Sequence, residues 1–185
     1  MAAPHRSSFR SRFPGARVCN RGFRYSEVVV ARLKWVFLLY RLPRNPSTPR
    51  IALWRGLRRL GTVQLADGLV ALPLDARTKE QLEWLAEEVV EAGGEASIWI
   101  AEAGSAAQER ALAGRMAEAV AAEYRAVSAA ALAARSSSPA ARRRTLRRLR
   151  RELRAIRLRD FFPPPDATEA RQAVEALAEA REATA

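Results

Sequence analysis

Arginines are the residues of this chain most able to bind a charged ligand, and many of them lie in one segment. Residues 142–159 hold ten arginines and one glutamate. A guanidinium group binds phosphate through parallel N–H donors, and neutralising a phosphate releases counterions from nucleic acid. The segment therefore predicts sequence-tolerant DNA binding. The candidate residues are Arg142, Arg143, Arg144, Arg147, Arg148, Arg150, Arg151 and Arg154, with assistance from Arg55, Arg58 and Arg59.

The apolar residues of the same segment predict a helix that leaves these arginines outside. Leu146, Leu149, Leu153 and Ile156 recur at three- and four-residue spacing and form one stripe. Few of the arginines are expected to read bases. Two other partners stay open for them: acidic groups of this or another protein, and an anionic membrane surface.

A second group of polar residues surrounds a predicted helix start. The helix N-terminus concentrates unpaired N–H donors and partial positive charge, which favour an oxyanion. The alternative is an ordinary capped helix with arginines in solvent. The candidate anion-binding residues are Arg41, Arg44, Ser47, Thr48 and Arg50.

The usual catalytic arrangements are missing. The chain has no glycine-rich phosphate loop, zinc-binding helix signature or serine nucleophile elbow. His5 and Cys19 are the only residues of their types, so the sequence argues against a catalytic triad, a His/Cys zinc site or an internal disulfide. We expect no enzyme activity, no catalytic residue, no metal and no cofactor.

The elements between residues 35 and 101 have the pattern of a sheet with two helices. Residues 35–42 predict a buried strand, and a helix runs from about 48 to 60. Residues 62–65 and 69–72 predict two strands, joined by an Asp67-Gly68 turn with positive φ at both positions. A second helix begins near Thr78 and ends at residues 93–94, and residues 96–101 form a fourth strand.

Two details of these helices can be tested. Ser47 or Thr48 is expected to cap the first helix, whose buried face should hold Ile51, Trp54, Leu57 and Leu60. Thr78 is expected to cap the second, with Gln81 completing a capping box.

Three further helices are expected after the sheet. Residues 104–135 carry one apolar stripe, a Ser-rich turn precedes the arginine-rich helix 140–159, and a tail helix covers about 168–182. We predict an α+β fold, with a ferredoxin-like split βαβ sheet domain at 34–102. An α-helical hairpin and tail helix make up the appendage at 103–185.

Charge is distributed unevenly along the 185 residues, which carry +12 in total. Residues 1–34 hold +7, residues 142–159 hold +9, and residues 160–185 hold −4. The Arg- and Ser-rich start is typical of an organelle transit peptide, but we favour a basic, unstructured extension over 1–33. No apolar stretch is long enough to span a bilayer, and no secretory signal is present, so we expect a cytoplasmic protein.

Three blocks of sequence resemble the amino-terminal domain of the chromate-resistance protein B family. They are LLYRLPRNPSTPRIALWRGLRRLG at 38–61, QLADGLVALP at 64–73 and EQLEWLAEEVVEAGGEA at 80–96, with RLRDFFP at 157–163 as a later match. The resemblance implies a bacterial transcriptional regulator of a chromate efflux operon, with chromate or another oxyanion as effector. Full-length members carry a further carboxy-terminal domain, which we expect to be absent from this chain.

Two rival functions come from other classes. The fold pattern also resembles a small CRISPR-associated nuclease that dimerises through its sheet, but that family closes the first strand with a metal-binding aspartate where this chain has Arg41. The other rival is a non-catalytic interaction module of a chromate resistance system. Homodimerisation is expected by analogy with the nuclease family.

Overall fold

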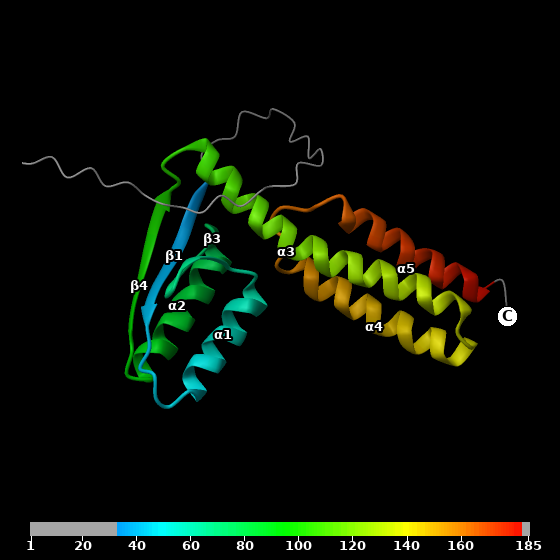
Figure 1. The fold of residues 1–185 in the computed structure, drawn as a ribbon, viewed down its shortest axis with the longest axis horizontal. Helices are drawn as coiled ribbons and strands as arrows, with labels where there is room; N and C mark the ends of the chain where they lie inside the picture. Colours follow the sequence, from blue (N-terminus) through cyan, green and yellow to red (C-terminus); the bar gives the residue numbers. More distant parts are fainter. Residues whose placement is uncertain (1–32, 183–185) are drawn as a thin grey trace, which may run out of the picture. The chain divides into compact units, whose positions relative to one another are not determined.

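The computed structural model describes residues 33–182, with side chains as far as residue 179. A strand, a helix, two strands, a helix and a strand come first (Figure 1). They are β1 (Lys34–Arg41), α1 (Thr48–Leu60), β2 (Val63–Ala66), β3 (Leu69–Pro73), α2 (Ala76–Glu91) and β4 (Glu95–Glu102). Then follow α3 (Ala106–Ala133), a short 3-10 helix η1 (Ala134–Ser136), α4 (Pro139–Arg157) and α5 (Asp166–Glu182).

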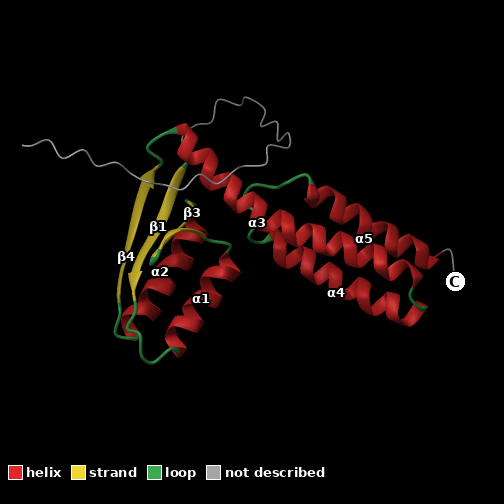
Figure 2. Ribbon diagram, in the orientation of Figure 1, coloured by secondary structure: helices red, strands yellow, loops and turns green. Residues whose placement is uncertain are grey.

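The four strands form one antiparallel sheet in the order β2-β3-β1-β4. β3 therefore lies between β1 and β2, as a split βαβ arrangement requires. Figure 2 shows the strands beside two helices, followed by a helical region. The antiparallel sheet and the helices together confirm the predicted α+β class.

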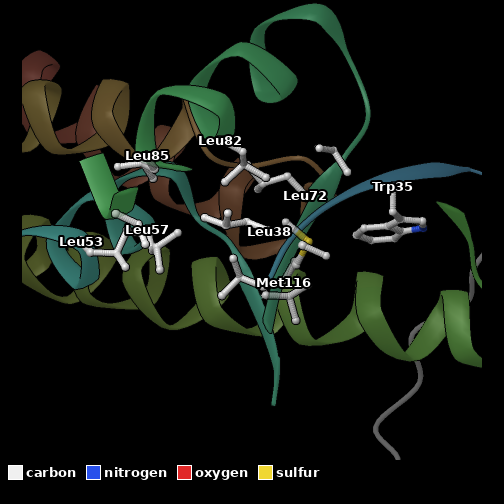
Figure 3. Packing of buried hydrophobic residues seen from close by; sticks show 13 residues of the cluster. Trp35, Leu38, Leu53, Leu57, Leu72, Leu82, Leu85 and Met116 are labelled. Carbon is white, nitrogen blue, oxygen red and sulfur yellow. The ribbon is translucent and has the colours of Figure 1, made fainter. Parts of the chain in front are cut away.

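The main core lies between the sheet and the first two helices. Val36 faces Leu72 across the β1–β3 pair and Leu38 faces Val70, so these side chains share one face of the sheet. Helix residues complete this cluster (Figure 3), and they include Leu53, Leu57, Leu82, Leu85 and Val89.

The buried face of α1 differs from the predicted one. Ile51 and Trp54 are 47% and 57% exposed, whereas Leu53 and Gly56 are buried beside Leu57. The reason is close helix packing, since a Cβ on Gly56 would lie 2.8 Å from Leu85 of α2. The small residue sets the face that meets α2, and the larger side chains turn outward.

Of the two predicted caps, the one in α1 is right in position and the one in α2 is wrong. Ser47 is the N-cap of α1 but makes no side-chain cap hydrogen bond, and Thr48 is the first helical residue. In α2 the cap is Asp75, whose carboxylate accepts from the Thr78 backbone N–H at 2.6 Å. The Thr78 hydroxyl in turn accepts from the Asp75 N–H at 2.9 Å, so Thr78 fills the third helical position of the capping box.

The hairpin between β2 and β3 also differs in its backbone. Gly68 has φ of 75°, but Asp67 does not have positive φ. A register shift between Gln64 and Ala66 accommodates the turn. The Tyr40 N–H donates to the Gly68 carbonyl at 2.7 Å and ties the turn to β1.

The three later helices build a second apolar cluster. Val120, Tyr124 and Val127 form a buried stripe on α3, and they share this cluster with Leu146, Leu149 and Ile156 of α4. The α5 side of the cluster consists of Ala167, Ala170, Val174 and Leu177. The predicted helical hairpin and tail helix are thus observed as three helices packed side by side (Figure 1).

The connection between α4 and α5 contacts both clusters. Phe162 packs on Trp35 of β1, with 6.1 Å between the ring centroids. Tyr124 of α3 donates its hydroxyl to the Asp160 carboxylate at 2.9 Å. This connection therefore joins the sheet core to the helices.

The predicted extension 1–33 and the transit-peptide alternative lie almost entirely outside the described residues. Among the helices of the described part of the chain, none is both long enough and apolar enough to cross a membrane.

Candidate nucleic-acid interface

α4 presents a continuous row of exposed arginines, which we call the arginine ridge. The helix begins after Ser138, whose hydroxyl accepts from the Ala141 N–H, and Pro139 occupies its first turn. The ridge lines a hollow of about 490 Å³, and all its members are exposed. They are Arg144, Arg147, Arg150, Arg151 and Arg154.

The apolar stripe of α4 explains why these arginines point outward. Leu146, Leu149 and Ile156 are buried against the other helices, so the guanidinium groups occupy the remaining faces. From residue 144 to residue 154 the helix rises about 15 Å. A DNA duplex carries roughly nine negative charges over that length.

Carboxylates compete for few of the arginines of α4. Arg148 pairs with Glu152 at 2.7 Å within the same helix. Arg142 is half-buried and donates to the backbone carbonyls of Arg135 and Ser137. Among the side chains described for residues 33–179, no carboxylate lies within ion-pair distance of the arginine ridge.

The acidic tail helix covers the apolar side of α4 and leaves the ridge exposed. α5 contributes Ala170, Val174 and Leu177 to the shared cluster. Its Asp166 pairs with Arg125 of α3 at 3.3 Å. Glu169, Glu175 and Glu179 are exposed.

The structure brings most of the predicted anion-binding residues to one hollow, which we call the loop cavity. It has a volume of about 670 Å³ and lies between the end of β1, the start of α1 and the β2–β3 turn. Thr48 is the predicted residue that does not line it. The polar and aromatic residues of its wall are Tyr40, Arg41, Arg44, Ser47, Arg50, Trp54, Gln64 and Asp67.

Charge in the loop cavity favours an anion. Three arginines and one aspartate line it, which leaves a formal charge of +2. Burial raises the pKa of the Tyr40 phenol, and the Asp67 carboxylate adds to this effect while Arg50 opposes it. The phenol therefore stays protonated at neutral pH and can donate a hydrogen bond.

The three arginines in the second half of α1 line neither of these sites, in contrast to Arg50 in its first turn. Arg55, Arg58 and Arg59 are exposed, as predicted, but none lines the hollow of the arginine ridge or the loop cavity. The Arg58 guanidinium lies 5.3 Å from the centre of the Trp54 ring, within range of a cation–π contact.

The sequence patterns did not single out several residues that line these hollows. Tyr40 and Trp54 were assigned to the strand and to a buried helix face, and Gln64 and Asp67 to a strand and a turn. Another hollow of about 490 Å³ joins Arg150 and Arg154 to Arg157, Arg171 and the Tyr124–Asp160 pair. Trp54 stands at the spacing of a buried helix face, so nothing in the sequence distinguishes it from a core residue.

No metal site is apparent in this region. Within residues 33–179, no three His, Cys, Asp or Glu side chains come together in a group that could hold an ion. Arg41 is the last residue of β1 and lines the loop cavity.

The fold and its sites define an α+β protein with an antiparallel sheet, a three-helix extension and several arginine-lined hollows. Residues 50–132 match the family model described as "Protein ChrB, N-terminal". Protein ChrB of Cupriavidus metallidurans is 35% identical over 133 residues, which cover 70% of this chain and 40% of the relative. The chain belongs to the ChrB family through its amino-terminal domain, which confirms the resemblance seen in the sequence. No solved structure matches it.

Proposed function

We propose that this chain is a component of a bacterial chromate resistance system that binds DNA through the arginine ridge of α4. In this proposal it acts in the cytoplasm as a transcriptional regulator or as part of one, and it has no catalytic activity. Its membership of the ChrB family supports the chromate system. The chain spans 40% of the length of its relative, so the regulatory role is part of the proposal.

The exposed arginine ridge is the observation that carries the DNA-binding part. Five guanidinium groups line one hollow, and the described carboxylates leave them unpaired. Burying the leucine stripe requires a helix but does not require arginine on its outer face. Holding like charges together on one helix costs stability, and binding a polyanion offsets that cost.

Binding of a fluorescent 20-base-pair duplex at low salt tests this proposal. Arg147→Ala with Arg151→Ala should weaken binding at least tenfold, because two phosphate contacts are lost. Arg110→Ala with Arg135→Ala removes the same charge from exposed positions off α4, and it should change the affinity less than threefold. Equal losses in both variants would contradict binding by the ridge.

The loop cavity supplies the proposed effector site, with an oxyanion such as chromate held near Arg41, Arg44 and Arg50. Chromate should release DNA from the wild-type chain. Arg44→Ala with Arg50→Ala should abolish that release while DNA binding without chromate is retained. Unchanged release in this variant would remove the effector site from the proposal.

A second candidate is an interaction module, and an exposed apolar patch on one side of the sheet favours it. Leu39 and Trp99 are 47% and 61% exposed. They share one face, because Trp99 faces Phe37 across the β1–β4 pair and Leu39 is two residues further along β1. Absence of DNA binding at low salt, with a dimer that Trp99→Ala dissociates in light scattering, would favour this function.

A further inference from the structure

The loop cavity holds more than a bare oxyanion needs. A tetrahedral anion uses N–H and O–H donors, which Arg44, Arg50 and Ser47 supply. The same wall also carries two aromatic rings, Tyr40 and Trp54. Aromatic side chains that flank arginines provide a stacking surface beside a phosphate site.

Trp54 is the most informative member of this wall. It lies on α1, which borders the cavity, and it is 57% exposed although its position has the spacing of the predicted buried face. Arg58 lies over its ring at 5.3 Å from the centroid. A cation against an indole helps to hold the ring in place, and the ring still borders the hollow.

Two hydrogen-bonding side chains complete the cavity at the β2–β3 end. Gln64 offers both a carbonyl acceptor and an amide donor, and Asp67 offers a carboxylate acceptor. Such groups pair with the ring nitrogens and exocyclic amines of a base. A carboxylate contributes nothing favourable to a site for a bare oxyanion.

We infer that the loop cavity binds a nucleotide, with the phosphate near Arg44 and Arg50, the base against Trp54, and its polar edge toward Gln64 and Asp67. The inference rests on the proposed anion site and specifies its ligand class. The cavity volume of about 670 Å³ is in the range of small-molecule sites. The ligand is either a free mononucleotide or an unpaired nucleotide of a single strand.

The test compares AMP with inorganic phosphate by isothermal titration of the full chain. AMP should bind at least tenfold more tightly than phosphate, because stacking on one aromatic ring contributes about that factor or more. Trp54→Ala should remove most of this preference and leave phosphate binding unchanged. Trp84→Ala is the matched control, since Trp84 is 60% exposed on α2 and does not line the cavity.

The outcomes separate this inference from the proposed anion site. Equal affinity for AMP and phosphate, or a preference that survives Trp54→Ala, would overturn the nucleotide and leave the oxyanion site standing. Absence of binding by either ligand would overturn both. A tetrathymidylate that binds more than tenfold tighter than AMP would support the inference and identify a single strand as the source, whereas similar affinities would support a free nucleotide.

Discussion

Tyr124 and Asp160 form a partly buried donor–acceptor pair that ties the α4–α5 connection to α3. The Tyr124 hydroxyl donates to Asp160 at 2.9 Å. Burial, followed by the bond to Asp160, raises the pKa of Tyr124 to about 12 from an ordinary 10.0. Burial also raises the pKa of Asp160, while the bond from Tyr124 acts in the opposite direction.

Tyr124→Phe tests this pair through stability as a function of pH. The unfolded tyrosine ionises near pH 10.0 and the folded one near pH 12. The wild-type free energy of unfolding should therefore fall as pH rises through this window. Urea denaturation of the variant should lack the Tyr124 component of this fall. At pH 7 the variant should lose about 1–3 kcal/mol, because Asp160 loses its donor. Identical pH profiles would contradict the assigned role.

Gly68 lines the loop cavity and forms part of the β2–β3 turn at its edge. Its φ is 75°, and an added Cβ would lie 2.3 Å from the Tyr40 carbonyl oxygen. Gly68→Ala should therefore destabilise the chain by more than about 1 kcal/mol in thermal unfolding. Gly93→Ala has the same φ with open space around the Cβ, so its loss should be smaller. Equal losses would show that backbone strain alone accounts for the effect.

The spacing of apolar residues, together with the turn residues, predicted most of the helices and strands. The leucine stripe of α4 and the valine–tyrosine stripe of α3 gave helices close to the observed Pro139–Arg157 and Ala106–Ala133. The face of α1 could not be predicted, because it depends on the approach of Gly56 to Leu85, a contact between distant residues. The loop cavity shares this limit, since its walls come from three separate segments.

The like charges of α4 lead to a prediction that does not involve DNA. Arg143, Arg147 and Arg151 stand at four-residue intervals, where like charges repel. Arg147→Ala with Arg151→Ala should therefore raise the free energy of unfolding by about 0.5–1 kcal/mol at low salt. Urea denaturation at low and high salt checks this, and the gain should shrink at high salt. A loss of stability would mean that the arginine stems contribute packing.

In the described molecule, the α4–α5 connection and α3 both join the helices to the sheet core. Phe161 and Phe162 of the RLRDFFP segment pack on the sheet core, where Phe162 meets Trp35. Met116 of α3 belongs to the same cluster. The described sheet and helices should therefore unfold cooperatively.

Phe162→Ala tests this cooperation by equilibrium denaturation. Phe162 is half-buried, so its loss should cost about 2–3 kcal/mol, less than a fully buried phenylalanine. Circular dichroism of the helices and fluorescence of the tryptophans should shift together. Trp84→Ala, an exposed control, should change stability by less than about 0.5 kcal/mol. Separate transitions in Phe162→Ala alone would identify this connection as the link, whereas separate transitions in the wild type would contradict one cooperative unit.

The salt dependence of duplex binding shows whether the arginine ridge contacts DNA phosphates. Affinity for DNA falls as the salt concentration rises, and each phosphate contact adds about 0.9 to the magnitude of the slope of log affinity against log salt. Arg147→Ala with Arg151→Ala should lower that slope by about 2, and Arg110→Ala with Arg135→Ala should leave it unchanged. A slope in the ridge variant equal to that of the wild type would show that α4 does not contact the phosphates, and it would contradict the proposed function.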